Sequence, residues 1–284
     1  MGILYLVATP IGNLEDITLR ALRVLREVSL IAAEDTRTAR HLLAHFGIAR
    51  PVTSYFEHNK LSKLATILRA LEQGDVAVIS EAGIPGLSDP GYELVRAVLA
   101  RGYRVVPLPG ANAALTALVA SGLPTDQFVY LGFLPRQRGA RRALLQSLVN
   151  EPRTLVAYEA PHRLGRTLED VAEILGDRVI CVARELTKMY EEFFRGTVAE
   201  VRAYFREHAP RGEFTLVIAG APAGDRKTRD VWDDAHVRAA VRALMAAGVA
   251  RTQAVKQVAQ QAGRERREVY RLAMASAPEA EDAE

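Results

Sequence analysis

Hydrophobic and polar positions in the first half of the chain alternate between two spacings. Short apolar runs, typical of strands buried on both faces, precede segments in which apolar residues recur every three or four positions, as on one helix face. The predicted strands are Ile3–Ala8, Leu30–Ala33, Val76–Ser80 and Val105–Val106. The helices predicted after them are Leu19–Val28, Arg37–Phe46, Tyr92–Ala100 and Ala111–Ala120. This order predicts an α/β domain with a mainly parallel sheet.

The periodicity breaks at Ser121–Asp126, where glycine, proline and polar residues cluster, and a second α/β set follows. Its predicted strands are Phe128–Gly132, Thr154–Tyr158, Val179–Ala183 and Phe214–Ala219, with helices at Arg141–Val149 and Leu164–Leu175. Beyond Gly220–Gly224, helical spacing returns over Ala235–Ala247, Thr252–Ala262 and Glu265–Ser276. We therefore expect two α/β domains, residues 1–121 and 122–224, that meet in a cleft, then a three-helix module, residues 225–276. The acidic residues 277–284 are expected to be disordered.

Charge is unevenly distributed along the 284 residues. The 37 Lys and Arg residues exceed the 34 Asp and Glu residues by three, and four of the acids lie in the last six positions. The expected three-helix module carries eight basic and two acidic residues between positions 235 and 276. This excess favours a polyanionic partner, although a solvated helical bundle or a dimer contact would also account for it.

Other features limit the classes of protein. Cys181 is the single cysteine and lies in an apolar run, so no disulfide can form within the chain and a reducing cytoplasm is expected. The uncharged segment Val105–Thr125 contains three prolines and is too interrupted to span a membrane. His41 and His45 lie four apart but lack further ligands at zinc-site spacing, so we predict no metal.

Glycine spacing excludes two common nucleotide-binding motifs. No two of the 20 glycines are separated by one residue, so the dinucleotide-binding pattern GxGxxG is absent. Gly86 and Gly91 have P-loop spacing, but Tyr92 stands where the lysine would be. Proline and glycine loops instead follow three predicted parallel strands, at Thr9–Asn13, Ser80–Gly91 and Pro107–Ala113. Such loops expose backbone groups at the carboxyl edge of the sheet, where open α/β sheets bind ligands.

The order of these loops resembles the tetrapyrrole-methylase superfamily, and within it the branch that methylates small-subunit ribosomal RNA. The matching segments are Val7–Leu14, Glu34–Arg37, Ser80–Gly91, Pro109–Ala113, Gly132–Pro135, Tyr158–Arg163 and Arg184–Lys188. The resemblance implies a homodimeric enzyme that binds S-adenosylmethionine in the interdomain cleft. It also implies methylation of the ribose 2'-oxygen of a decoding-centre cytidine, cytidine 1402 in the family, in 16S rRNA of the small ribosomal subunit.

The resemblance also implies positions for the cofactor. Carried over by position, the cofactor-binding residues are Pro10, Gly12, Ser80, Glu81, Ala82, Gly83, Asn112, Ala113, Tyr158, Glu159, Leu186 and Thr187. The chain departs from the family pattern in the second loop, where Glu81 and Ile84 replace an aspartate and a threonine. Ile84 cannot make the hydroxyl contact that the threonine would make.

Methyl transfer is an in-line displacement that depends largely on positioning, and a base that takes the hydroxyl proton adds roughly 10²–10⁴-fold. The candidates near the cleft are Glu159, Glu185 and Lys188, with Asp89 and Glu191 ranked lower. We favour Glu159, while for each of these carboxylates an N-cap role or an ion pair with Arg163 or Arg184 is at least as consistent with the sequence. Lys188 would be a base only if burial lowered its pKa, and would otherwise hold a phosphate.

Two basic clusters are expected to contact RNA. The first follows the Gly132–Pro135 loop and consists of Arg136, Arg138, Arg141 and Arg142; the second is Arg264, Arg266 and Arg267 at the start of the last helix. Two alternatives remain open: a C-methyltransferase acting on a tetrapyrrole, and a non-catalytic RNA-binding assembly factor that has kept the fold. The first of these gives no reason for a basic helical module.

Overall fold

The computed structural model describes residues 2–222, 234–262 and 264–274. The chain forms two compact units, Met1–Pro222 and Ala223–Glu284, called unit 1 and unit 2 below. In the described residues, no helix is long and apolar enough to cross a membrane.

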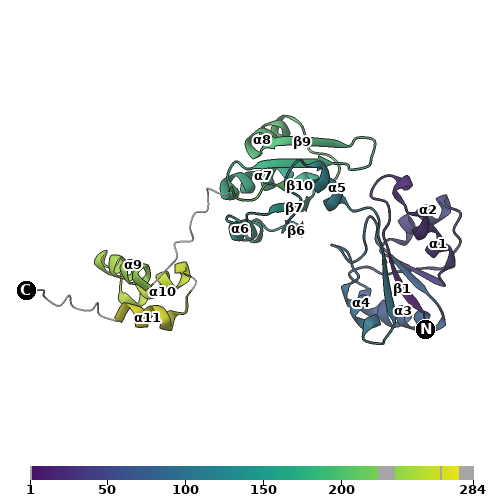
Figure 1. Cartoon of the computed structure of the whole chain (residues 1–284), viewed down its shortest axis with the longest axis horizontal. Coiled ribbons are helices and arrows are strands. Elements are labelled where there is room, and N and C mark those ends of the chain that lie inside the picture. Colours follow the sequence, from purple (N-terminus) through teal and green to yellow (C-terminus); the bar gives the residue numbers. More distant parts are fainter. Residues whose placement is uncertain (1, 223–233, 263, 275–284) are drawn as a thin grey trace, which may run out of the picture. The chain divides into compact units, whose positions relative to one another are not determined.

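Unit 1 begins with a five-stranded parallel sheet in the order β3-β2-β4-β1-β5. Its strands are β1 (Ile3–Val7), β2 (Leu30–Ala33), β3 (Val52–Ser54), β4 (Val76–Ile79) and β5 (Arg104–Leu108). Helices α1 (Leu19–Glu27) and α2 (Thr36–His45) cover one face, and α3 (Lys60–Gln73) and α4 (Tyr92–Leu99) cover the other (Figure 1). Because both faces are covered, β4 is buried at every position, as expected for a central parallel strand.

A second five-stranded sheet of unit 1 has the order β6-β7-β10-β8-β9, and only β6 and β7 are parallel. Its strands are β6 (Phe128–Phe133), β7 (Thr154–Glu159), β8 (Val179–Arg184), β9 (Glu192–Thr197) and β10 (Phe214–Ile218). Helices α6 (Arg138–Ser147), α7 (Pro161–Leu175) and α8 (Val198–Glu207) pack on one face. Helix α5 (Ala113–Ala120) packs on the other, against Val156, Cys181 and Val217.

Helix α5 was expected to belong to the first domain, residues 1–121, but it packs on the second sheet. Its sequence is apolar on nearly every side, so it needs apolar cover on more than one face. The second α/β body therefore begins, in packing terms, near Asn112. The predicted α/β class with two sheets is confirmed, and β3, α3, β9 and α8 are elements that our sequence analysis did not predict.

Unit 2 consists of α9 (Asp234–Ala246), α10 (Arg251–Ala262) and α11 (Arg266–Met274) in its described part. Val237, Val241, Val255, Val258 and Val269 form its buried core with two alanines, as the apolar spacing predicted. The expected acidic tail, residues 277–284, lies outside the described residues.

Candidate functional site

The neighbouring strands β1 and β4 form a topological switch point in the first sheet. The chain leaves β1 toward β2 on one side and leaves β4 toward β5 on the other. In open α/β sheets, ligands bind in the crevice outside the carboxyl ends of two such strands. The loops that follow β1 and β4 are joined there by paired backbone hydrogen bonds: the Thr9 N–H donates to the Gly83 carbonyl at 2.9 Å, and the Gly83 N–H to the Thr9 carbonyl at 3.1 Å.

A cavity of about 170 Å³ lies at this switch point. It is lined by the two loops and by α2; the lining includes Thr9, Pro10, Gly12, Ser80, Glu81, Thr38 and His41. Four residues of the predicted cofactor set therefore meet in one cavity, and Ala82 and Gly83 continue the same loop. The cavity is smaller than the roughly 300 Å³ at which drug-sized ligand sites begin, so it would hold only part of a molecule as large as S-adenosylmethionine.

The third predicted loop reaches the same sheet edge. A Cβ on Gly110 would lie 2.6 Å from the Cβ of Ala8, so only glycine allows this loop to approach the end of β1. Asn112 caps α5, because its Oδ1 accepts from the Leu115 N–H at 2.9 Å. The Tyr158 hydroxyl accepts from the Ala114 N–H at 3.2 Å, which ties the end of β7 to the start of α5.

Residues 185–188 close over Gly12. A Cβ on Gly12 would lie 2.9 Å from the Leu186 carbonyl oxygen and 2.8 Å from Thr187 Oγ1. Glu185 and Thr187 have φ values of +49° and +66°, which are strained conformations for residues other than glycine and concentrate at functional sites. Thr187 Oγ1 is buried and has no hydrogen-bond partner among the described residues. Only a residue without a side chain fits at position 12, and Thr187 places a buried hydroxyl with unused hydrogen-bonding capacity beside it.

Glu159, our favoured base, is buried and fully engaged. One carboxylate oxygen accepts from the Ala160 N–H at 2.8 Å and pairs with Arg163 at 2.5 Å, and the other accepts from Thr167 at 2.5 Å. These contacts favour the ion-pair alternative, because a carboxylate held in this way has no oxygen left for a substrate proton.

Glu185 and Lys188 bind each other rather than standing free. Lys188 Nζ donates to Glu185 at 3.0 Å and to Glu213 at 3.1 Å. Burial alone would lower the pKa of Lys188, but its hydrogen bonds to Glu185 and Glu213 outweigh burial and raise that pKa. Lys188 is therefore a cation at neutral pH, which argues against a general-base role and leaves a phosphate contact as its alternative. The same ion pair, opposing burial, lowers the pKa of Glu185.

Asp89, which the sequence ranked low, has a pKa suited to a base. Burial, and then the negative charge of Glu34, raise the pKa of Asp89 to about 7. The preceding residue, Ser88, has a φ of +63° and its hydroxyl lies 2.7 Å from the Tyr130 hydroxyl of β6. The residue before Asp89 therefore ties the β4 loop to the second sheet. Sequence spacing gave no signal for it, because its pKa depends on Glu34, which is distant along the chain.

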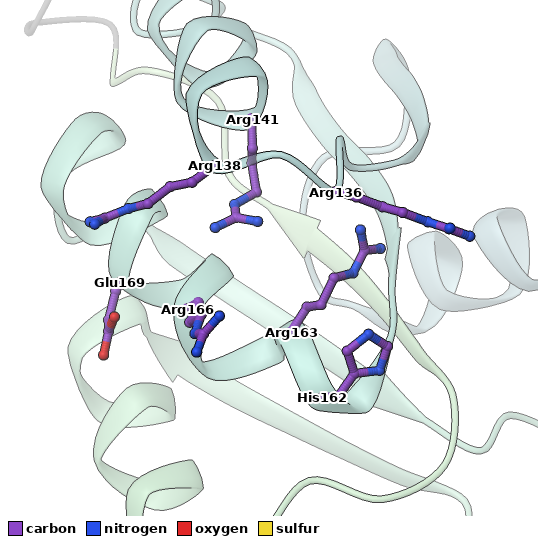
Figure 2. A pocket seen from close by; sticks show the side chains of 7 residues that line it. All are labelled: Arg136, Arg138, Arg141, His162, Arg163, Arg166 and Glu169. Carbon is purple, nitrogen blue, oxygen red and sulfur yellow. The ribbon is translucent and has the colours of Figure 1, made fainter.

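The first predicted RNA-binding cluster is largely paired. Arg138, Arg141 and Arg142 all donate to the fully buried carboxylate of Asp170 on α7, and Arg142 also pairs with Glu173. Arg141 is 3% exposed and so is not available to RNA, whereas Arg136 is exposed and has no ion pair among the described residues. Figure 2 shows another cavity of unit 1, about 530 Å³, around this cluster, with Arg141 and Arg163 among the side chains that line it.

In unit 2, the second predicted cluster also contains both ion-paired and exposed arginines. Arg264 pairs with Asp234 at 2.7 Å and with Glu268 at 3.2 Å, so it joins the start of α11 to the start of α9. Arg266 and Arg267 are exposed at the first turn of α11. Throughout the described ranges, no group of three His, Cys, Asp or Glu side chains is placed to hold a metal ion.

Comparison with known proteins identifies relatives of this chain. Residues 3–202 match the family described as Tetrapyrrole (Corrin/Porphyrin) Methylases. A Synechocystis protein named ribosomal RNA small subunit methyltransferase I is 50% identical over 276 residues, covering 96% of this chain and 98% of that protein. A Thermotoga maritima protein of the same name is 48% identical over 221 residues, which is 78% of this chain but 99% of that protein, a length close to that of unit 1.

Solved structures agree on the fold. A cobalamin biosynthetic enzyme, cobalt precorrin-4 methyltransferase, superposes with a TM-score of 0.59 at 17% identity, covering 76% of this chain and 94% of that one. At that identity the likeness concerns the fold alone. From the family match over residues 3–202 and the near-full-length relative, the chain belongs to the tetrapyrrole methylase family, in its group of ribosomal RNA small subunit methyltransferases I.

Proposed function

We propose that this protein transfers a methyl group from S-adenosylmethionine to the ribose 2'-oxygen of a decoding-centre cytidine, cytidine 1402, of 16S rRNA. The observation that carries the proposal is the 50% identity, over nearly the whole of both chains, to a protein named ribosomal RNA small subunit methyltransferase I. That identity also favours an RNA substrate over a tetrapyrrole, and an enzyme over a non-catalytic assembly factor.

The cofactor would lie over the β1–β4 switch point. Pro10, Gly12 and Ser80 line the cavity there, and the buried hydroxyl of Thr187, unpaired among the described residues, lies beside Gly12. S-adenosylmethionine supplies an electrophilic methyl group on a sulfonium. The residues that hold it supply position, since the reaction requires the acceptor oxygen, the methyl carbon and the sulfur in line, with water excluded.

Asp89 is the residue that we assign to the acceptor proton. Its pKa of about 7 leaves a large fraction of the carboxyl ionised at neutral pH while keeping it basic enough to take a proton. Tyr158 is unsuited to the role, because burial, and then the neighbouring Tyr130, raise its pKa and keep its hydroxyl neutral.

The remaining parts of the proposal concern assembly and location. Leu115 and Val119 lie one turn apart on α5 and are 47% and 73% exposed, which suits contact with a second copy of this chain in a homodimer. Arg266 and Arg267 of unit 2 would contact rRNA. A substrate in the small ribosomal subunit, together with the buried free thiol of Cys181, is consistent with the cytoplasm.

Transfer of a labelled methyl group to small ribosomal subunits from cells that lack this protein tests the proposal. We expect label in 16S rRNA, located by mass spectrometry at one cytidine 2'-oxygen. Uroporphyrinogen without RNA is the control substrate and should stay unlabelled. Absence of label in rRNA, or methylation of the porphyrinogen instead, would contradict the proposed function.

A further inference from the structure

The basic cavity of about 530 Å³ is separate from the switch-point cavity and shares no lining residue with it. It lies between the loop after β6 and the first turns of α6 and α7 (Figure 2). Its lining consists of Arg136, Arg138, Arg141, His162, Arg163, Arg166 and Glu169. Five guanidinium groups around one cavity repel one another, so this arrangement is stable only where anions balance it.

Two buried carboxylates balance part of this charge. Asp170 holds Arg141 at 2.6 Å and Glu159 holds Arg163 at 2.5 Å. Glu169 is the acidic group in the lining itself. Set against five arginines, these three carboxylates leave two positive charges on the guanidinium groups. We assign the two unbalanced charges to Arg136 and Arg166, because both are exposed and neither forms an ion pair among the described residues.

The ends of two helices add to the positive potential. Arg138 is the first residue of α6, and His162 and Arg163 lie in the first turn of α7. Within the described residues, neither N-cap, Gln137 or Ala160, makes a side-chain capping hydrogen bond. The first N–H groups and the dipole of each helix therefore favour an anion at this end. Arg163 Nε is also buried without a partner among the residues described.

We propose that this cavity binds phosphate groups of the RNA backbone, an inference that rests on the proposed function. Planar guanidinium groups match the oxygens of a phosphate and pair with them bidentately. The volume is within the range of sites that enclose an extended ligand, and it exceeds what a single ion needs.

An aromatic side chain beside the cavity favours nucleic acid over an acidic peptide. Phe133 is 58% exposed and lies three residues before Arg136, so their Cα atoms are within about 11 Å of each other. An exposed ring at this distance offers a surface on which a base can stack while the adjoining phosphate is held. Phe133 also contacts Tyr158, one of the proposed cofactor residues, with ring centroids 5.3 Å apart.

The relative from Thermotoga maritima supports an RNA contact within unit 1. It bears the same name, yet 99% of its length is matched by only 221 residues of this chain, nearly the length of unit 1. That protein is shorter than this chain by about the length of unit 2, which supports an RNA contact made by the α/β bodies.

Anisotropy of a fluorescent RNA hairpin of the decoding region, titrated with the full-length protein at several salt concentrations, tests this inference. The variant carries Arg136→Gln and Arg166→Gln. The matched control carries Arg50→Gln and Arg104→Gln, which remove the same charge from exposed positions at the amino edge of the first sheet. Loss of two phosphate contacts should weaken binding about 10- to 100-fold near 0.1 M salt and reduce the slope of log K against log salt by about 1.4–1.8. The control should change affinity by less than about threefold, because distant exposed charges are screened.

Cofactor affinity, measured by calorimetry, should stay the same in both variants. The inference would be overturned if the variant with Arg136→Gln and Arg166→Gln kept the wild-type salt slope, or if the control lost as much RNA affinity as that variant. Tight calorimetric binding of inorganic phosphate alone, or displacement of the RNA by a polyglutamate peptide at matched ionic strength, would assign the cavity to another ligand. Methyl transfer to small subunits is measured separately. If the variant with Arg136→Gln and Arg166→Gln transfers methyl groups at the wild-type rate and with an unchanged KM, the proposed RNA contact in the cavity is refuted. If RNA binding depends on the cavity but the wild-type protein transfers no methyl group to the subunits, the proposed function is refuted.

Discussion

Replacing Asp170 with asparagine should destabilise unit 1 more than an ordinary loss of a hydrogen bond would. The Asp170 carboxylate is fully buried and accepts hydrogen bonds from Arg138, Arg141 and Arg142, which join α6 to α7. Arg138 and Arg142 are partly exposed and can recover water, but Arg141 is 3% exposed and would remain as an unpaired buried charge. Breaking such a buried pair costs about 3–5 kcal/mol.

Urea unfolding followed by circular dichroism measures this loss. With an m-value of about 2–3 kcal/mol/M, a loss of 3–5 kcal/mol lowers the midpoint by about 1–2.5 M. Glu173→Gln is the matched control: Glu173 pairs with Arg142 on the exposed side of the same cluster, and a surface pair contributes at most about 1 kcal/mol. If Asp170→Asn shifts the midpoint no more than Glu173→Gln does, the buried cluster is not what holds the two helices together.

The pH dependence provides a second check. Burial would raise the pKa of Asp170, but the hydrogen bonds from Arg141, Arg142 and Arg138 outweigh it and hold that pKa below its ordinary value. A carboxyl with a lowered folded-state pKa stabilises the protein above its unfolded pKa of about 3.9, and the stabilisation is lost as the pH falls through the folded value. The difference between wild type and Asp170→Asn should therefore be constant at neutral pH and shrink in acid. A difference that grows below pH 4 would refute the assignment.

Three further outcomes are expected. Gly12→Ala should weaken cofactor binding at least about tenfold in calorimetry, because the new Cβ would lie 2.9 Å from the Leu186 carbonyl oxygen. Its control is Gly139→Ala in α6, where an added Cβ has no atom within 4 Å and should raise the free energy of unfolding by about 0.5–1 kcal/mol. Asp89→Asn should lower kcat about 10²–10⁴-fold. Because the raised pKa of about 7 disfavours the charged carboxylate in the folded protein, the variant should also be more stable than wild type at pH 8, by about 2 kcal/mol after discounting for partial exposure. This difference in the free energy of unfolding should close as the pH falls from 7 to 4. Equal kcat, or a gap that widens in acid, would remove Asp89 from the mechanism. Truncation after Pro222 should weaken RNA binding while leaving cofactor affinity within about twofold, and equal loss of both would make unit 2 a structural element.

The strands of the first sheet were predictable because both faces of a parallel sheet need continuous apolar runs, as in Val76–Ile79. The elements that were missed carried readable signals of another kind. Helix α8 begins with a capping box, in which Thr197 and Glu200 exchange side-chain to backbone hydrogen bonds, and this spacing of Thr and Glu marks a helix start in the sequence. Strand β9 has two apolar residues among its six, and none of the six is fully buried, so its apolar content did not distinguish it from a loop.

The loops of the candidate site could be predicted from proline and glycine, but the states of its side chains could not. That Asp170 gathers three arginines depends on contacts 28 to 32 residues apart, and periodicity gives no information on such contacts. The raised pKa of Asp89 likewise depends on its burial and on Glu34, brought close by the sheet order. For charged residues, spacing predicted where they lie in the fold, and tertiary packing decided which of them are free.

The thin apolar core of unit 2 has a consequence for how that unit responds to a target. In its described part, fewer than 45 residues enclose a centre made of valine and alanine, with leucine and methionine at the margin. Domains of this size have little stability to spare, so any ligand that binds only the folded form shifts the balance strongly, by about 2.7 kcal/mol at a hundred times its dissociation constant. Resistance of α9–α11 to proteolysis should therefore rise when the correct polyanion is present, which makes the folding of unit 2 itself a reporter of substrate engagement.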